Sequence, residues 1–280
     1  MSRKQAAQEP DQPESRTHAV AEAVAAGWHR AYGAGRLDVP LCVVATIAAA
    51  PRRDARGGDT AAMMLAWSVE EFFAYSKLVW KTVVRRQPDT GSLLYPLIAW
   101  IFQQPSAELR AHAHEVAMAA LRSGEVDLLG GEHRCAVDLL GTVLTVLRSP
   151  SASKERGQFY TPPDIADLMA RMSDVEYMDA VEDPMMGTGG MFRAAAVAMR
   201  EAGRDPRSIR WAGCDIDEMA VACATVNSMI WGLGEDILFY AGDILLTADW
   251  KTIARARRDE LRTLAADVER YRALFGLLET

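Results

Sequence analysis

The 280-residue chain carries 31 Lys and Arg residues against 38 Asp and Glu residues, which gives a formal net charge of −7. This negative charge argues against strong independent DNA binding, because proteins that bind DNA without a partner usually present a basic face to the phosphates. The longest apolar run, residues 41–50, is about half as long as a bilayer-spanning helix, and the N-terminus has no apolar signal core. Four cysteines without CxxC spacing favour reduced thiols. We therefore expect a cytoplasmic protein with no membrane partner.

The first half of the chain is expected to be helical. Residues 1–16 are rich in Gln, Glu, Pro and Ser and predict a disordered tail. Residues 17–148 show the apolar spacing of helices, which predicts a helical N-terminal domain. The side chains in it that come closest to a metal-ligand set are His112, His114, His133 and Cys135. Their spacing fits no common zinc pattern, so we expect no metal.

The pattern changes to α/β after residue 148. Residues 149–249, which begin with a Ser-rich linker, read as strand, turn, helix, strand, turn, helix, strand. This order predicts part of a Rossmann-like, doubly wound sheet. Residues 250–280 predict a long C-terminal amphipathic helix that packs on the domain or on a partner. Its seam, in steps of three and four residues, is Ala254, Arg257, Leu261, Leu264, Val268, Tyr271, Phe275 and Leu278.

Glycines and carboxylates gather where the first two expected strands end. Asp183 closes the first strand, and Gly187, Thr188 and Gly189 follow in a turn before a helix. Glycine lets the backbone of such a turn approach a ligand without obstruction by a Cβ atom. Asp215 ends the next strand, where a carboxylate can accept hydrogen bonds from both hydroxyls of a ribose. The pattern predicts a nucleoside pocket, against the plainer interpretation that these residues only form turns.

Four segments follow one another in a recognisable order: GQFYTP at 157–162, DPMMGTGG at 183–190, GCDID at 213–217 and GD at 242–243. Together they resemble the S-adenosyl-L-methionine (AdoMet) pocket of adenine-N6 DNA methyltransferases of the type I restriction-modification kind. The resemblance implies that the first segment closes over the methionine end of the cofactor and that the last acid meets the adenine amine. The cofactor-binding residues that it implies are Phe159, Tyr160, Thr161, Asp183, Gly187, Thr188, Gly189, Asp215 and Asp243. The pair Met185-Met186 departs from the small residues that the family places in the turn.

The sequence after Asp243 holds no Asn/Asp/Ser-Pro-Pro-Tyr/Phe motif. In the family this motif binds the target amine and stacks on the flipped base, so the catalytic residues remain unknown here. The nearest acid-aromatic pair is Asp249-Trp250. We expect a family member truncated before this motif, without the fourth strand that normally pairs with the first. A protein partner or a homodimer is then expected to cover the open sheet edge.

Three functions remain open at this point. The first is an AdoMet-binding adenine-N6 DNA methyltransferase-like protein of a restriction-modification system, with DNA as a possible partner by resemblance, and inactive alone or completed by a partner. The second is a non-catalytic nucleoside-binding module that serves regulation or assembly. The third is a methyltransferase for a small molecule or a protein, against which the GQFYTP segment argues.

Overall fold

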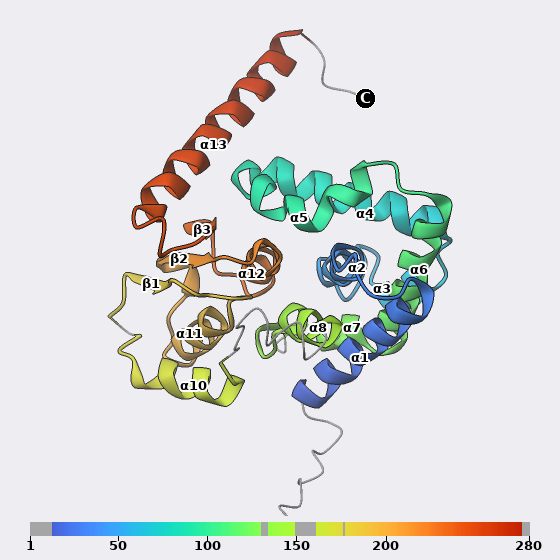
Figure 1. Cartoon of the computed structure of the whole chain (residues 1–280), viewed down its shortest axis with the longest axis horizontal. Coiled ribbons are helices and arrows are strands. Elements are labelled where there is room, and N and C mark those ends of the chain that lie inside the picture. Colours follow the sequence, from blue (N-terminus) through green and yellow to red (C-terminus); the bar gives the residue numbers. More distant parts are fainter. Residues whose placement is uncertain (1–12, 130–133, 149–160, 176, 276–280) are drawn as a thin grey trace, which may run out of the picture. The chain divides into compact units, whose positions relative to one another are not determined.

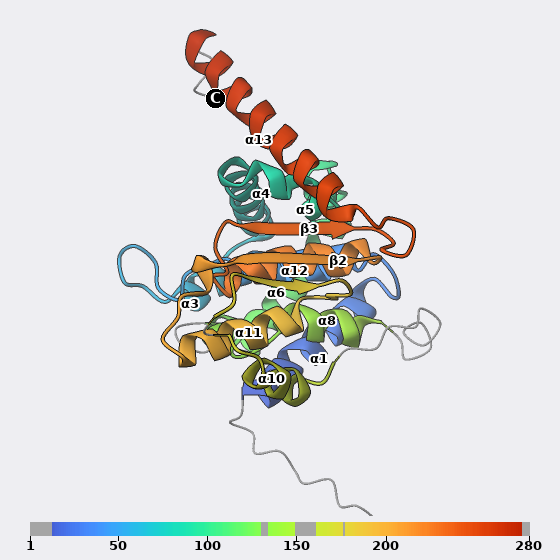
Figure 2. The same cartoon turned by 90° about the vertical axis from the view of Figure 1, so that its left-hand side faces the viewer.

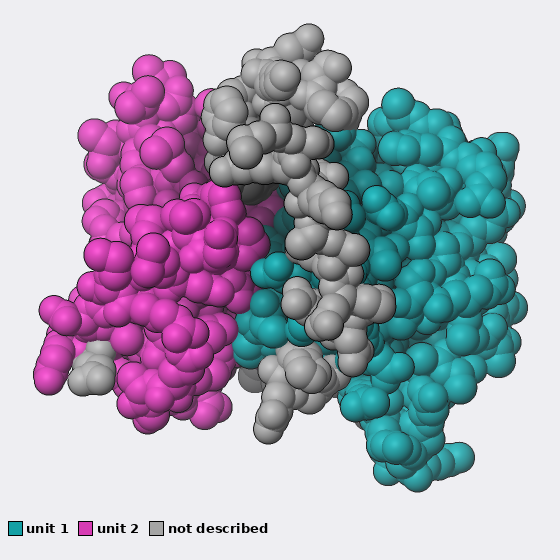
Figure 3. Space-filling view, turned by 90° about the horizontal axis from the view of Figure 1, so that it is seen from below, with its two compact units in different colours: residues 1–73, 105–159 teal, residues 74–104, 160–280 magenta. Residues whose placement is uncertain are grey.

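The computed structural model describes residues 13–129, 134–148, 161–175 and 177–275. Figure 1 draws these residues in colour and the remaining ones in grey. The chain divides into two compact units (Figure 3). Unit 1 comprises Met1–Phe73 and Pro105–Phe159, and unit 2 comprises Ala74–Gln104 and Tyr160–Thr280.

Unit 1 is built of helices. They are α1 (Pro13–Ala31), α2 (Asp38–Ala48), α3 (Thr60–Leu65), the start of α4 (Val69–Arg86), α6 (Ala107–Arg122), α7 (Glu125–Leu128) and α8 (Leu139–Leu147). Helix α1 packs against α6 and α8 and contributes the fully buried Trp28, whose Nε1 donates to the carbonyl of Gly35 at 2.9 Å. Ser106 begins α6, where its hydroxyl accepts the N–H of Leu109. Within the described ranges, no helix is long and apolar enough to cross a membrane.

Unit 2 is a parallel α/β layer. Its elements are the end of α4, η1 (Pro88–Thr90), α5 (Gly91–Phe102), α10 (Pro163–Met172), β1 (Ala180–Asp183), α11 (Gly190–Glu201), η3 (Pro206–Ser208), β2 (Arg210–Asp215), α12 (Glu218–Ile230), β3 (Ile237–Ala241) and α13 (Trp250–Phe275). The strands lie side by side in the order β1-β2-β3, all parallel (Figure 2). Asp183 pairs in register with Gly213, and Asp215 pairs with Ala241. The carboxyl ends of all three strands therefore meet at one edge of the sheet.

The two faces of the sheet are covered by different helices. Helix α11 contacts β1, and α12 contacts β2 and β3. Phe192 of α11 anchors this side, stacked on Phe239 and edge-to-face with Trp211, with ring centroids 5.6 Å apart in both pairs. On the other face the first turns of α13 pack Trp250 and Ala254 against alternate strand residues, namely Ala212, Cys214 and Leu238. The three-stranded parallel sheet and the long C-terminal helix are thus present.

Residues 74–104 group with the α/β unit, whereas the sequence analysis assigned them to the helical N-terminal domain. The reason is tertiary packing, because α5 lies against α12 and also contacts β3. The loop before α5 is tied to α13 as well, since Arg262 donates to Asp89 of η1 at 3.1 Å. No local sequence signal distinguishes a helix that packs on a sheet from one that packs on other helices.

Candidate functional site: the carboxyl edge of the sheet

The Gly-rich turn between β1 and α11 has a backbone that only glycine adopts readily. Gly187 and Gly189 have φ angles of 55° and 92°, in the left-handed region. The turn is fastened at its start because the Asp183 carboxylate accepts the N–H of Met185 at 3.0 Å. A Cβ built on Gly190, the first residue of α11, would meet no atom within 4 Å, so the backbone faces open space where the turn enters the helix. A ligand can therefore approach the backbone closely here.

Asp215, at the end of β2, links the turn to the next helix. Its Oδ2 accepts the N–H of Gly187 at 2.8 Å, and its Oδ1 accepts the N–H of Asp217 at 2.9 Å. Asp217 in turn caps α12 by accepting the N–H of Met219. One carboxylate thus fixes the Gly-rich turn of the first crossover relative to the start of the second crossover.

The turn is also supported from beneath by α12 and β2. Buried Asn227 donates from Nδ2 to the carbonyl oxygen of Thr188 at 2.9 Å. Met186 is buried, and a Cβ on Gly213 would collide with its sulfur atom. Met185, by contrast, is 77% exposed. The two methionines that replace the family's small residues therefore have different positions: Met186 fills the space above a strand glycine, and Met185 is exposed to solvent.

Carboxylates make this edge electronegative. Burial, and secondarily the charge of Asp215, raise the pKa of Asp183, although its hydrogen bond from Met185 opposes the shift. The pKa of the Cys214 thiol is raised to about 11, first by burial and then by Asp215 and Asp243. Asp215 thus acts on Asp183, and Asp215 and Asp243 both act on Cys214 between them. Such an edge favours a ligand that carries positive charge.

The structure brings most of the expected site residues together. Asp183, Gly187, Thr188, Gly189 and Asp215 lie at the carboxyl ends of β1 and β2, with Thr188 buried in the turn. Asp243 follows Gly242, whose N–H donates to the carbonyl of Asp215 at 2.9 Å, so it lies at the same edge. Thr161 is exposed just before α10. Phe159 and Tyr160 lie outside the described residues.

Three further residues shape the site, and the sequence analysis gave none of them a role there; it noted Met186 only as a departure from the family pattern. Ile216 is 69% exposed between Asp215 and Asp217, and Asn227 and Met186 hold the turn from below. An apolar residue between two acids after a strand is a signal that sequence reasoning can use for Ile216. The role of Asn227 depends on a partner 39 positions away in the chain, which no local pattern indicates.

A parallel α/β layer with a Gly-rich first turn and an acid ending the second strand is an arrangement found in nucleoside-binding α/β units. Comparison with known proteins narrows the class. The family profile described as N-6 DNA Methylase matches residues 137–260, which include all of the strand-end acids. Residues 137–260 therefore match the N-6 DNA methylase family, in line with the sequence resemblance.

One curated relative is the type I restriction enzyme MjaIX methylase subunit of Methanocaldococcus jannaschii. It is 31% identical over 111 residues, which are 39% of this chain and 20% of the relative. The chain thus matches one fifth of that relative's length. Among solved structures, the type I restriction-modification methyltransferase subunit of Streptococcus thermophilus superposes with a TM-score of 0.40 at 16% identity, over 84% of this chain and 59% of that one. This last likeness is too weak to support an argument.

Proposed function

We propose that unit 2 is a Rossmann-like methyltransferase domain that binds AdoMet at the carboxyl edge of its sheet. The observation that carries this proposal is the position of Asp215, which ends β2 and accepts the Gly187 N–H of the Gly-rich turn at 2.8 Å. The family match over residues 137–260 supports the choice of AdoMet among nucleoside ligands. AdoMet carries a sulfonium charge, which the carboxylates of this edge favour.

The residues present fit the cofactor. A carboxylate has about four lone-pair sites, and two of those on Asp215 are taken by the N–H groups of Gly187 and Asp217. The remaining sites are available to ribose hydroxyls. Asp243 then meets the adenine amine, and exposed Ile216 offers an apolar surface to the ring. The Gly-rich turn and Thr161, followed by α10, flank the methionine end; when bound, AdoMet supplies the transferable methyl group.

We further propose that the chain is an adenine-N6 DNA methyltransferase-like protein of a restriction-modification system, working in the cytoplasm with a protein partner. Among the described strands, β1 pairs only with β2, which leaves its other edge for a strand that a partner supplies. The sequence after Asp243 lacks the Pro-Pro motif that recognises the base. That absence also favours the second candidate, a non-catalytic AdoMet-binding module. Methyl transfer to DNA is therefore assigned to the complex and not to the isolated chain.

Calorimetric titration with AdoMet tests the pocket. Asp215→Asn keeps one carbonyl oxygen for the turn but loses the charge, so it is expected to weaken binding by about tenfold or more, the value of one charge-assisted hydrogen bond. Asp205→Asn is a matched control, because Asp205 accepts the N–H of Arg207 in the same kind of turn before β2, at the opposite edge. Equal affinities in the two variants, or no binding by the wild type, would refute the pocket.

A second assay tests whether methyl transfer requires a protein partner. Tritiated methyl transfer to adenine-containing duplex DNA is measured with the purified chain alone and with proteins that co-purify with it. Transfer is expected only in the second case. Transfer by the purified chain alone would contradict partner dependence, while AdoMet binding without transfer in either case would favour the non-catalytic module.

A further inference from the structure

Helix α13 extends beyond the part of the chain that the family covers. The match to N-6 DNA methylases ends at residue 260, whereas α13 runs from Trp250 to Phe275. Its inner side is held to unit 2 by ion pairs: Arg258 with Asp236 at 3.3 Å, Arg262 with Asp89 at 3.1 Å and Glu269 with Arg85 at 3.5 Å. These ion pairs join one side of α13 to the rest of unit 2, and its other side lies outside them.

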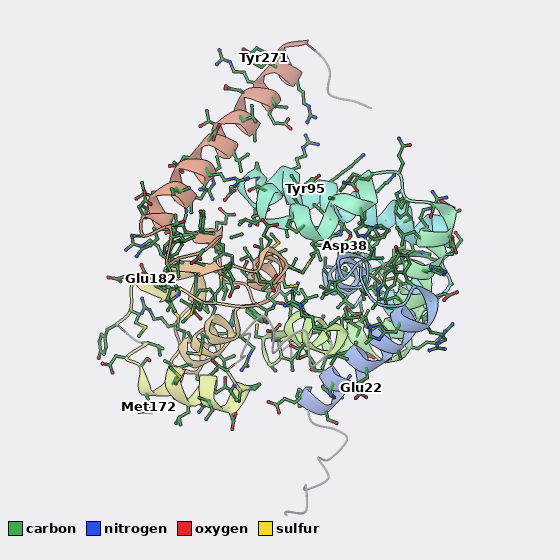
Figure 4. The ribbon with its side chains drawn as sticks, in the orientation of Figure 1. Glu22, Asp38, Tyr95, Met172, Glu182 and Tyr271 are labelled. Carbon is green, nitrogen blue, oxygen red and sulfur yellow. The ribbon has the colours of Figure 1, made fainter. Side chains whose placement is uncertain are left out.

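The outer side of α13 carries an apolar seam in solvent. Leu264 is 58% exposed, Val268 40% and Tyr271 59%, at steps of four and three residues, and Leu261 extends the seam inward. Figure 4 shows Tyr271 near the outer end of the helix. Three-four spacing is the heptad pattern of a coiled coil, with Leu261 and Val268 at a positions and Leu264 and Tyr271 at d positions. The same repeat begins at Ala254, which is buried against the sheet.

We propose that this seam (Leu261, Leu264, Val268 and Tyr271) pairs with the same seam of a second copy of the chain in a parallel two-stranded coiled coil. The side chains that flank the seam specify both the partner and the direction. Glu260 and Asp267 occupy g positions, and Arg272, which also pairs with Glu269 of its own helix at 3.0 Å, occupies an e position. In a parallel pair, each Asp267 faces Arg272 of the second copy, whereas an antiparallel pair would oppose the acids Glu260 and Asp267.

The inner contacts of α13 leave room for this partner. Arg262 and Glu269, which hold the helix to unit 2, occupy b positions, and b lies well outside the a/d stripe on a helical cross-section. Arg258, which pairs with Asp236, occupies an e position beside the stripe but precedes Leu261, so between residues 261 and 271 a second helix at the a/d stripe displaces none of these three ion pairs. The pairing concerns a different surface from the AdoMet pocket and does not depend on cofactor binding.

The oligomeric state of the full chain tests the seam. Light scattering after size exclusion is expected to give twice the 30.7 kDa chain mass for the wild type at tens of micromolar. Leu264→Glu is expected to raise the dimer dissociation constant by at least about a hundredfold, because two leucines per dimer lose their burial. Thr263→Glu adds the same charge at the exposed neighbouring c position and is expected to remain dimeric. A monomeric wild type, or equal loss in both variants with unchanged helix content, would overturn the seam.

Cross-linking tests the direction of pairing. In a Cys135→Ser background, Leu264→Cys is expected to form a disulfide-linked dimer on mild oxidation, because d positions face each other in a parallel, in-register pair. Thr263→Cys is expected not to cross-link. Asp267→Lys should weaken the dimer, and the double change Asp267→Lys with Arg272→Glu should restore it. A dimer whose Leu264→Cys variant fails to cross-link would overturn the parallel arrangement.

Discussion

The contact between Gly213 and Met186 makes a quantitative prediction about how the Gly-rich turn is seated. Gly213 lies in the middle of β2, and Met186 from the turn occupies the space above it. A Cβ at Gly213 would collide with the Met186 sulfur and would lie 2.9 Å from two ring atoms of Phe192. The turn therefore rests on a strand position that has no side chain.

The effects of changing either residue can be estimated separately. Gly213→Ala gains about 0.5–1 kcal/mol from reduced unfolded-state entropy but loses about 1–3 kcal/mol to overpacking, so it is expected to be destabilising overall. Met186→Ala loses about 2–5 kcal/mol of burial and leaves a cavity. In the double variant the new methyl group enters part of that cavity, so the two losses should fall short of additivity by about 1–2 kcal/mol. Rescue stays partial because the ring of Phe192 is held by Phe239.

Urea denaturation of the four proteins in this double-mutant cycle measures the free energy of unfolding. Hydrogen exchange of the β2 amides locates the change in unit 2. Gly213→Ala is also expected to weaken AdoMet binding, because Met186 belongs to the turn of the proposed cofactor pocket. Strict additivity of the two substitutions would refute the packing argument, since residues that do not compete for one space show no coupling.

Three other changes test a buried acid of unit 1, a hydrogen bond that supports the Gly-rich turn, and an ion pair between α10 and α11. Burial raises the pKa of Glu125 in unit 1 well above its ordinary value. The free energy of unfolding is therefore highest at low pH and falls by about 1.4 kcal/mol for each pH unit between the ordinary and the raised pKa. Glu125→Gln should abolish this slope in denaturation curves measured from pH 4 to 8. Asn227→Ala should cost about 1–3 kcal/mol and weaken AdoMet binding several-fold, because it removes a buried hydrogen bond to Thr188. Asp167→Asn should cost about 1–2 kcal/mol by breaking the 2.7 Å ion pair with buried Arg193, as urea denaturation would show; unchanged midpoints would contradict the last two.

Much of unit 2 was predictable because its signals are local. The strands end in Asp183 and Asp215, and glycines with positive φ follow the first of them, so period and turn chemistry locate the edge without tertiary information. The long C-terminal helix was equally predictable from its repeat. Its apolar repeat packs on the sheet at buried Ala254 and is exposed to solvent at Leu264, and only the structure shows where the change occurs.

Other features depend on contacts between distant parts of the chain. Residues 74–104 belong to unit 2 because α5 packs against α12, although their apolar pattern is that of any buried helix. The positions of Met185 and Met186 also required coordinates. The sequence shows only that the pair departs from the family's small residues, and the structure shows that the first is exposed while the second packs on β2.

The turn interpretation and the pocket interpretation of the strand-end acids turn out to be compatible. Asp183, Asp215 and Asp243 each accept the N–H of the residue two positions later, at 3.0, 2.9 and 2.8 Å, so the same small turn occurs at or just after the end of each strand. Each turn uses one carboxylate oxygen. The second oxygen of Asp215 accepts the N–H of Gly187 in the neighbouring turn. An acid that forms a local turn can therefore still accept hydrogen bonds from other groups at the sheet edge. The local fold therefore explains why the acids occur at these positions, and the proposed nucleoside pocket uses only the lone pairs that these turns leave over.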